Sequence, residues 1–371
     1  MSSSNPRWAY PTWIQGAEVT AFWRTIAADP TSSVLYISGL GFDPRMLLGM
    51  RAVLEAFPPE RRHCVMMIAE IAEVAADDTL SDLTAANLTE AQTIIGSAVS
   101  PAVFPMFSGT ESIVGPRLVN DHVSKVIQVQ SANHWVVDVS SLPRIIFIPL
   151  ISMLIAHADR LRSQGKKQNF HVIVGDNSEI DRAIAGTGID LSATPSLGFS
   201  ASVESDSKRH IPRVWIPLLG DNQEGNLRNV RNYADPDNNA VILPMIPFPA
   251  LDPRRPDAVL TSHRILFEEF GVEVGNILYA GESNPFDVYQ QVLSISHSYN
   301  ENMKDLGGAN IILSPLSSKV QSIGVCLAAH ELKARGVLVA IVQTMPTSYQ
   351  FTNTDYGETR LQSLWLSGDG V

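Results

Sequence analysis

The most constraining feature of this sequence is a series of short runs in which nearly every residue is apolar. The runs that we predict to be strands lie at 33–37, 63–71, 135–139, 170–174, 240–243, 276–280, 309–313 and 336–342. A strand that is buried on both faces has this composition, whereas a strand with one wet face alternates apolar and polar residues. Helical patterns follow most of the runs, so the sequence predicts an α/β fold with parallel sheets covered by helices.

The chain has 371 residues, of which 45% are hydrophobic, and this is enough for two hydrophobic cores. We therefore predict two Rossmann-like units with mainly parallel sheets flanked by helices. The predicted division is an N-terminal aromatic arm at 1–30, a first Rossmann-like domain at 31–200, an irregular connector or lid at 201–240 and a second Rossmann-like domain at 241–371. The connector is rich in Ser, Asn, Asp and Gly, which is typical of loops and insertions.

Two short motifs recur in the two halves of the chain. Asp-Pro-Arg occurs at 43–45 and at 252–254, and the pattern G-[DE]-x-x-x-x-D occurs at 175–181 and at 281–287. Each copy stands shortly before a predicted helix. Recurrence of this kind indicates a duplicated structural unit, and chance is the alternative because the motifs are short.

The first thirty residues contain three tryptophans, Trp8, Trp13 and Trp23. One interpretation is that the arm packs on the main body through these rings. The other is that the rings form a contact in a homo-oligomer or with a partner protein, because clustered exposed aromatic residues mark interfaces.

Charge and cysteine content limit the setting in which the protein works. The net charge of −11 argues against a general nucleic-acid coat and against binding to an anionic membrane surface. Cys64 and Cys326 lie in apolar runs, which is typical of buried free thiols in a reducing compartment. The start of the sequence does not resemble a signal peptide, and the apolar segment at 145–156 is shorter than the ~20 residues that span a bilayer. We expect a cytoplasmic protein with no membrane segment.

The polar turn after the run at 309–313 is the first candidate for a binding site. It carries Ser317, Ser318 and Lys319 at the start of a predicted helix. Hydroxyls and backbone N–H groups at a helix N-terminus bind phosphate or carboxylate, and a lysine adds positive charge. The alternative is that Ser317 is a plain N-cap and Lys319 a solvated residue of the first turn. The turn is not a P-loop, because G-x-x-x-x-G-K is absent.

Two further turns carry acids directly after predicted strands. Asp176 and Asn177 follow one strand, and Glu282 and Ser283 follow another. The carboxyl ends of parallel strands meet at one edge of a sheet, so these side chains would lie on the same side as Lys319. They could bind Mg²⁺ or ribose hydroxyls, or act as acid and base, and Asp176 and Glu282 are the candidate catalytic residues. The alternative is that they cap and begin helices.

Arginines at the Asp-Pro-Arg motifs complete the set of candidates. Asp43, Arg45 and Arg254 could bind a phosphate or carboxylate, because a guanidinium binds such groups through two hydrogen bonds. Alternatively, Asp–Arg pairs brace the turns. The histidines and cysteines have no spacing typical of a metal site, and we predict none; Mg²⁺ is the single cofactor that the acids suggest.

Together, these patterns predict a protein that binds a nucleotide-like or other phosphorylated small molecule in a cleft at the carboxyl ends of the strands. The acids would allow it to act on this ligand as a transferase or hydrolase. The alternative is a non-catalytic ligand-sensing or scaffold subunit of a larger protein complex. None of the turns matches a defined catalytic motif, so the sequence leaves open whether the protein is an enzyme.

Overall fold

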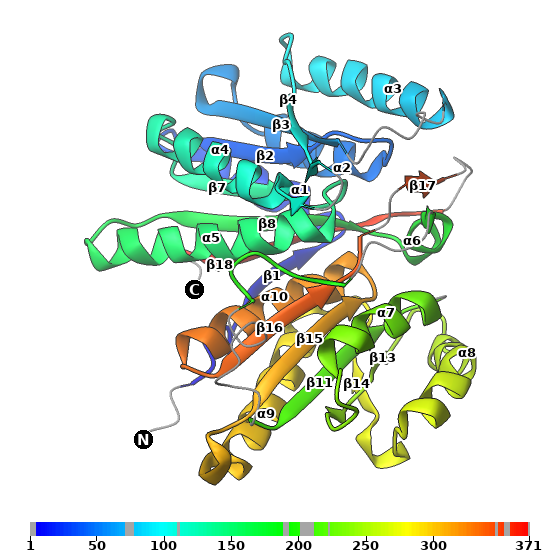
Figure 1. The fold of residues 1–371 in the computed structure, drawn as a ribbon. Coiled ribbons are helices and arrows are strands. Elements are labelled where there is room, and N and C mark those ends of the chain that lie inside the picture. The colour runs from blue at the N-terminus through cyan, green and yellow to red at the C-terminus, as the bar shows by residue number, and fades with distance from the viewer. Residues whose placement is uncertain are drawn as a thin grey trace. The chain divides into compact units, whose positions relative to one another are not determined.

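The computed structural model describes residues 5–70, 78–109, 112–187, 193–200, 211–221, 223–345, 348–351 and 357–369. The chain divides into two compact units, each built from two segments. Unit 1 comprises Met1–Arg7 and Gly188–Pro346, and unit 2 comprises Trp8–Thr187 and Thr347–Val371. Each unit has a sheet of mostly parallel strands flanked by helices, which confirms the predicted α/β fold with two Rossmann-like units (Figure 1).

The main sheet of unit 2 has the order β1-β18-β8-β7-β2-β3-β4. The bounds in that order are Thr12–Gln15, Arg360–Ser367, Asn169–Asp176, His134–Asp138, Val34–Gly39, Arg62–Glu70 and Ala102–Pro105. The strands from β8 to β4 are parallel, whereas β18 pairs with β8, and β1 with β18, in the antiparallel sense. Two small antiparallel pairs also belong to unit 2, namely β5 (Phe107–Ser108) with β6 (Ser112–Ile113), and β9 (Ala185–Thr187) with β17 (Ser348–Gln350).

The sheet of unit 1 has the order β10-β16-β15-β11-β13-β14. The bounds in that order are Thr194–Pro195, Leu338–Gln343, Asn310–Leu316, Arg213–Leu219, Met245–Pro247 and Leu278–Ala280, and β12 (Val241–Ile242) also pairs with β11. Only β10 is antiparallel to its neighbour among these described strands.

Both units have the same order of parallel strands. Numbered along the chain, the parallel strands of unit 2 lie in the order 3-2-1-4-5, and so do those of unit 1 when β12 and β13 are taken as one interrupted strand. This is the order of a Rossmann fold, which reverses between strands 1 and 4. The reversal falls between β2 and β7 in unit 2 and between β11 and β15 in unit 1.

The antiparallel strand beside each fifth strand comes from an exchanged segment of the chain. After β8, the fifth parallel strand of unit 2, the chain continues to β10, which pairs with β16 in unit 1. After β16, the fifth parallel strand of unit 1, the chain continues to β18, which pairs with β8 in unit 2. Each sheet is therefore extended beyond its fifth parallel strand by the segment that follows the fifth parallel strand of the other sheet.

Helices follow most of the strands, as the sequence predicted. In unit 2 they are α1 (Glu18–Ala28), α2 (Arg45–Leu54), α3 (Asp78–Ile95), α4 (Gly115–Val129), α5 (Arg144–Ser163) and α6 (Ser178–Ala183), with the short 3-10 helix η1 (Pro59–Arg61). In unit 1 they are α7 (Glu224–Ala234), α8 (Arg255–Phe270), α9 (Pro285–Asn302) and α10 (Lys319–Ala334), with the 3-10 helices η3 (Val274–Asn276) and η4 (Lys304–Leu306). Within the described ranges, none of these helices is long and apolar enough to cross a membrane.

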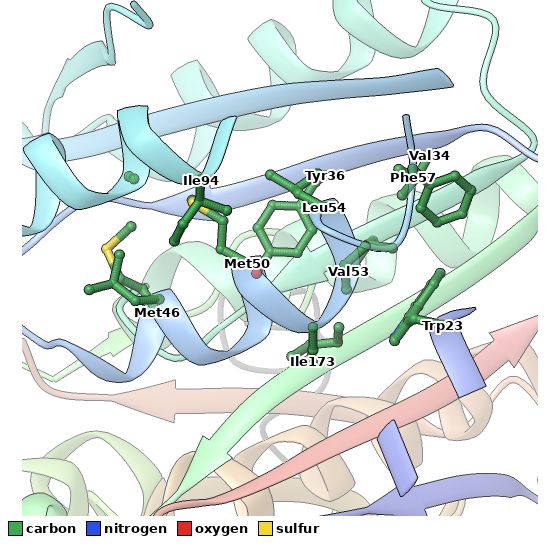
Figure 2. Packing of buried hydrophobic residues seen from close by; sticks show 14 of the residues in the cluster. Trp23, Val34, Tyr36, Met46, Met50, Val53, Leu54, Phe57, Ile94 and Ile173 are labelled. Carbon is green, nitrogen blue, oxygen red and sulfur yellow. The ribbon is translucent and has the colours of Figure 1, made fainter. Parts of the chain in front are cut away.

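One hydrophobic cluster of unit 2 is formed by the sheet together with helices α1, α2 and α3. Figure 2 shows Tyr36 and Ile173 of the sheet packed against Met50 and Val53 of α2 and against Trp23 of α1. Trp23 is fully buried, and so is Trp8, whose indole nitrogen donates to the carbonyl of Leu366 at 3.1 Å. Two of the three N-terminal tryptophans thus pack inside this unit, and a contact of the arm with another subunit or a partner stays a prediction.

The core of unit 1 defines which helices cover which face of its sheet. Trp215 and Ile312 of the strands pack with Leu227 of α7 and Val259 of α8. The opposite face carries α9 and α10 (Figure 1). These two helices approach closely at Gly324, where a Cβ would lie 2.7 Å from Cβ of Val288.

Two predicted features look different in the structure. The segment 201–240, expected to be irregular, contains β11 and α7, while 201–210 and 222 lie outside the described residues. Residues 214–219 are all buried, and burial explains why an apolar island in a polar stretch forms a central strand.

The echoed motifs do not occupy equivalent positions: residues 43–45 follow the first parallel strand of unit 2, and 252–254 follow the second strand of unit 1. The repetition lies in the strand order, and an internal duplication stays a prediction.

Candidate functional site

The residues that the sequence singled out are divided between the two units. Unit 1 contains Arg254, Glu282, Ser283, Ser317, Ser318 and Lys319, and unit 2 contains Asp43, Arg45, Asp176 and Asn177. All of them lie in or beside turns that follow strands. The single cleft that would contain both sets stays a prediction, and each set has its own local structure.

The turn of residues 317–319 joins β15 to α10. Ser318 is the N-cap of α10, and its Oγ accepts a hydrogen bond from the backbone N–H of Gln321 at 3.2 Å. Ser317 is 5% exposed and Ser318 7% exposed, whereas Lys319 is half-buried. The capping role that the sequence offered for Ser317 is thus performed by Ser318. Lys319 is the first residue of the helix, where a positive charge opposes the helix dipole unless an anion lies nearby.

This turn lies where the strand order of unit 1 reverses. The turn that follows the neighbouring strand β11 begins at Gly220, and the two turns touch. A Cβ on Gly220 would lie 3.2 Å from the carbonyl oxygen of Leu316 and 3.3 Å from Cα of Ser317. A glycine at this position therefore allows the backbones of the two turns to approach each other.

A buried glutamine stands at the carboxyl end of the next strand. Gln343 is the last residue of β16 and is 2% exposed. Neither its amide nitrogen nor its amide oxygen has a hydrogen-bond partner in the described part of the chain. Beside it, the hydroxyl of Thr344 donates to Asn226 of α7 at 2.8 Å. Sequence reasoning missed Gln343, because one glutamine at the end of an apolar run carries no motif.

A second polar cluster of unit 1 is centred on Arg255. Its guanidinium forms ion pairs with Asp221, at 3.1 Å, and with Glu282. The second carboxylate oxygen of Glu282 accepts from the backbone N–H of Leu251 at 2.9 Å. Arg255 therefore connects the turns after β11 and β14 to the start of α8. Arg254, which the sequence singled out, is the exposed N-cap residue of α8, and the next residue, Arg255, is the arginine that forms these buried ion pairs.

The turn at Glu282 also contains a helix cap. Asn284 is the N-cap of α9, and its Oδ1 accepts from the backbone N–H groups of Phe286 at 3.0 Å and Asp287 at 3.1 Å. Asp287 in turn accepts from the backbone N–H of Gly281 at 2.6 Å. The caps expected as the alternative at this turn are present, with Asn284 rather than Ser283 bonded to the first turn.

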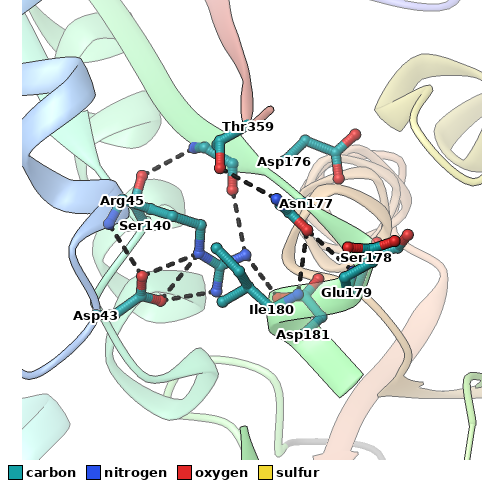
Figure 3. A network of polar contacts seen from close by, with 12 residues as sticks. Asp43, Arg45, Ser140, Asp176, Asn177, Ser178, Glu179, Ile180, Asp181 and Thr359 are labelled. Atoms are coloured by element: carbon teal, nitrogen blue, oxygen red, sulfur yellow. Dashed lines mark hydrogen bonds and ion pairs between the residues drawn. The ribbon is translucent and has the colours of Figure 1, made fainter. Parts of the chain in front are cut away.

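In unit 2, Asp43 and Arg45 form a buried ion pair (Figure 3). Arg45 Nη2 lies 2.7 Å from Asp43 Oδ2, and Arg45 Nη1 lies 2.8 Å from Asp181 Oδ1. Burial lowers the pKa of Arg45, but the carboxylates of Asp181 and Asp43 outweigh this effect and raise it overall. Each guanidinium nitrogen has a protein partner, so the arginine braces the turn between β2 and α2.

Asp176 and Asn177 lie at the end of β8 in the same region. Asn177 is the N-cap of α6, and its Oδ1 accepts from the N–H groups of Glu179 at 3.0 Å and Ile180 at 3.1 Å (Figure 3). Asp176 accepts from the side-chain amide of Gln362 at 3.0 Å. Both residues are buried, at 8% and 6% exposure respectively.

One recurrence in the two units was not visible before the strands were ordered. The fourth parallel strand of unit 2 is followed by Ser140 and Ser141, and α5 begins at Arg144. The fourth parallel strand of unit 1 is followed by Ser317 and Ser318, and α10 begins at a lysine. Two serines and a basic first helical residue therefore occupy equivalent turns. Sequence reasoning missed this because Leu-Pro separates the serines from Arg144.

Comparisons with known proteins do not identify the site. The chain matches no protein-family model and no curated protein. A functionally unknown protein, PA1789 from Pseudomonas aeruginosa PAO1, is 11% identical, with a TM-score of 0.22 over 88% of this chain and 95% of that chain. A structure described as the GsuK channel bound to NAD is 10% identical, with a TM-score of 0.17 over 91% of this chain and 77% of that one. Likenesses this weak carry no argument about fold or function.

Proposed function

We propose that unit 1 binds a nucleotide-like or other phosphorylated small molecule at the carboxyl ends of β11 and β15. The observation that carries the proposal is that the reversal of strand order coincides with the 317–319 turn and the start of α10. In open α/β sheets, ligands bind where the order reverses, because the connections that leave the two strands there lead to opposite faces of the sheet.

The chemistry of the turn fits an anion. The N-terminus of α10 presents backbone N–H groups that the helix itself does not use, and the helix dipole favours a negative charge there. Lys319 stands in the first turn, where its own charge is unfavourable to the dipole. The helix N-terminus and the lysine would both stabilise a bound phosphate.

The state of Glu282 favours a ligand-sensing role as the second candidate function. One of its carboxylate oxygens is paired with Arg255 and the other accepts from the backbone of Leu251. A general base needs a free oxygen within hydrogen-bond reach of the substrate. The contacts of Glu282 therefore fit a residue that stabilises the turn better than they fit the general base of a transferase or hydrolase. Mg²⁺ binding by these acids stays a hypothesis.

Replacement of Lys319 by alanine tests the proposal. Loss of one charge-assisted hydrogen bond weakens binding by about 1.5–3 kcal/mol. We expect Lys319→Ala to reduce the thermal stabilisation by phosphorylated ligands in a panel of inorganic phosphate, ribose 5-phosphate and nucleoside monophosphates.

The matched control is Lys304→Ala in the same unit. Lys304 is highly exposed in η4, which precedes β15 and so lies toward the amino end of that strand. We expect this variant to respond to the panel as the unmodified protein does. Equal responses of the unmodified protein and Lys319→Ala would exclude the anion role of the turn.

A further inference from the structure

The amide of Gln343 is a buried polar group that the described fold does not satisfy. Its nitrogen and oxygen both lack hydrogen-bond partners in the described ranges, and the side chain is 2% exposed. Burial of an amide without partners is unfavourable, because the group loses its hydrogen bonds to water and gains none. The interior of unit 1 therefore contains one hydrogen-bond donor, the amide nitrogen of Gln343, and one acceptor, its amide oxygen, that could bond to a ligand.

The strand register places this amide close to the 317–319 turn. Leu313 pairs with Ile341, so two residues further along Gln343 lies beside β15 two residues before Ser317. The Cα atoms of Gln343 and Ser317 are therefore roughly 8 Å apart, since the rise is about 3.3 Å per residue and neighbouring strands are about 4.8 Å apart.

The side-chain alternation of β16 sets the direction of the amide. Ala340 and Val342 belong to the apolar cluster under α7 and α8. Ile341 and Gln343 therefore face the opposite side of the sheet, which is the side that α10 covers. The amide therefore lies on the α10 side of the sheet, at the level of β15 two residues before the 317–319 turn.

A second buried polar group stands on the same face. Ser196 is fully buried, and its hydroxyl has no hydrogen-bond partner in the described part of the chain. Its backbone N–H donates to the carbonyl of Ile341 at 2.7 Å, and Thr194 pairs directly with Gln343. Gln343 of β16 and Ser196, which directly follows β10, are therefore two buried polar side chains on one face of the sheet.

We infer that Gln343 recognises the base of a nucleoside phosphate whose phosphate binds at the 317–319 turn. A carboxamide presents one donor and one acceptor in a plane, and it pairs with the edge of a base that carries an acceptor beside a donor. The separation from the turn is one that a nucleoside monophosphate bridges and inorganic phosphate does not. This inference rests on the proposed function and narrows its ligand from phosphorylated small molecules to nucleoside phosphates.

The test compares Gln343→Leu with the unmodified protein against AMP, GMP, ribose 5-phosphate and inorganic phosphate. Leucine keeps a similar volume but removes both polar atoms. We expect the affinity for the nucleotide that binds best to fall tenfold or more, while the affinity for ribose 5-phosphate changes less than twofold. We also expect the ligand-free variant to melt at a higher temperature, because an unsatisfied polar group has been removed.

Gln168→Leu is the matched control, and Gln343→Met is a second variant for the case that the leucine variant does not fold. Gln168 is a buried glutamine of unit 2 whose amide donates to the carbonyl of Ala132 at 3.2 Å. Its replacement should lower the melting temperature and leave ligand affinities unchanged.

The outcomes separate this inference from the proposed function. If phosphates bind through Lys319 but Gln343→Leu and Gln343→Met keep the ratio of nucleotide to ribose 5-phosphate affinity, base recognition by Gln343 is wrong and the proposed function stands. If none of the phosphates binds the unmodified protein, both are wrong.

Discussion

The phenol of Tyr36 donates a hydrogen bond to the carboxylate of Asp138 in the core of unit 2, and Gly49 of α2 packs directly on this pair. Burial raises the pKa of Tyr36 well above its usual value, and the nearby Asp138 carboxylate raises it further. The backbone N–H of Ser140 donates to the other oxygen of Asp138 at 2.8 Å. The pair therefore joins β2 to β7, the two strands between which the order of unit 2 reverses.

The close approach of α2 to this pair predicts the effect of Gly49→Ala. The new Cβ would lie against Asp138 Oδ2, 2.8 Å from Ile173 Cγ2 and 2.9 Å from the Tyr36 hydroxyl. Overpacking of this kind destabilises by about 1–3 kcal/mol, which exceeds the gain of about 1 kcal/mol in helix propensity. Urea unfolding should show a lower free energy of unfolding.

Gly225→Ala in α7 is the control for this prediction. A Cβ at Gly225 meets nothing within 4 Å, so its replacement should leave stability unchanged or raise it by up to about 1 kcal/mol. Equal effects of the two substitutions would mean that α2 does not press on the Tyr36–Asp138 pair.

The buried histidine pair of unit 2 predicts a dependence of stability on pH. Nδ1 of His134 and Nε2 of His171 lie 3.1 Å apart, and the ring of Trp23 lies against His171. Burial lowers the pKa of His134 to about 4, and burial together with the charge of His134 lowers the pKa of His171 well below its usual value. Both rings are therefore neutral in the folded protein at pH values where the unfolded chain is already protonated.

Below pH 6.5 the folded state binds fewer protons than the unfolded state. The free energy of unfolding is therefore at its full value above pH 6.5, and it decreases as the pH falls from 6.5 toward 4. For His134 the difference between 6.5 and about 4 amounts to about 3 kcal/mol. Unfolding in urea at pH 7.5, 6.0 and 5.0 measures the loss. His171→Phe should flatten the profile, and an unchanged slope in that variant would assign the pH dependence to other groups.

The Arg255–Glu282 ion pair predicts a large effect of removing one partner. Both side chains are buried, at 8% and 3% exposure, so Glu282→Gln would remove the negative charge of one of the carboxylates that pair with the arginine. Breaking a buried pair destabilises by about 3 kcal/mol, whereas Glu268→Gln in the exposed Arg264–Glu268 pair should change stability by less than about 1 kcal/mol.

The double replacement Arg255→Met/Glu282→Gln tests whether Glu282 is the structural partner of Arg255. If Glu282 only braces the turn, the double variant should be less destabilised than the sum of the two single variants and should still bind phosphorylated ligands. Additive losses of stability would show that the two side chains do not act as a pair.

The contact between the turns at Gly220 and Ser317 predicts that Gly220→Ala weakens ligand binding. The added Cβ would push against the backbone at Leu316 and Ser317, at 3.2 and 3.3 Å, and so displace the start of α10. We expect an affinity loss of about tenfold, or about 1.4 kcal/mol, in calorimetric titration with the best ligand of the panel. The nearby Gly225→Ala should bind normally; unaltered binding by Gly220→Ala would place the ligand away from these turns.

The strands buried on both faces were predictable because their residues are apolar throughout. The run at 309–313 became β15, and the run at 33–37 became β2. By contrast, β18 contains the buried polar residues Gln362 and Ser363, and its pairing with β8 determines its conformation. A strand that mixes apolar and buried polar residues has no recognisable pattern until the strand that pairs with it is known.

The candidate site was predictable only as a set of turns. Which of two adjacent arginines points inward depends on the start of α8: Arg254 remains at the surface and Arg255 is buried. In the same way, Ser318 rather than Ser317 caps α10, since the helix begins at Lys319. A change of one residue in a helix boundary reverses such assignments, and local sequence does not determine boundaries to that accuracy.

The sequence by itself determined the alternation of strand and helix, the apolar strands and the polar turns that follow them, because these depend on residues close together in the chain. Only the tertiary structure decided which strands are neighbours. Trp215 of β11 donates to Ser314 of β15 at 3.0 Å across a separation of 99 residues, and that pairing brings the 317–319 turn against Gly220. The exchange of β10 and β18 and the burial of Gln343 arise in the same way. Such pairings depend on the burial of entire sheet and helix faces against one another. A local pattern of residues does not determine which faces pack together.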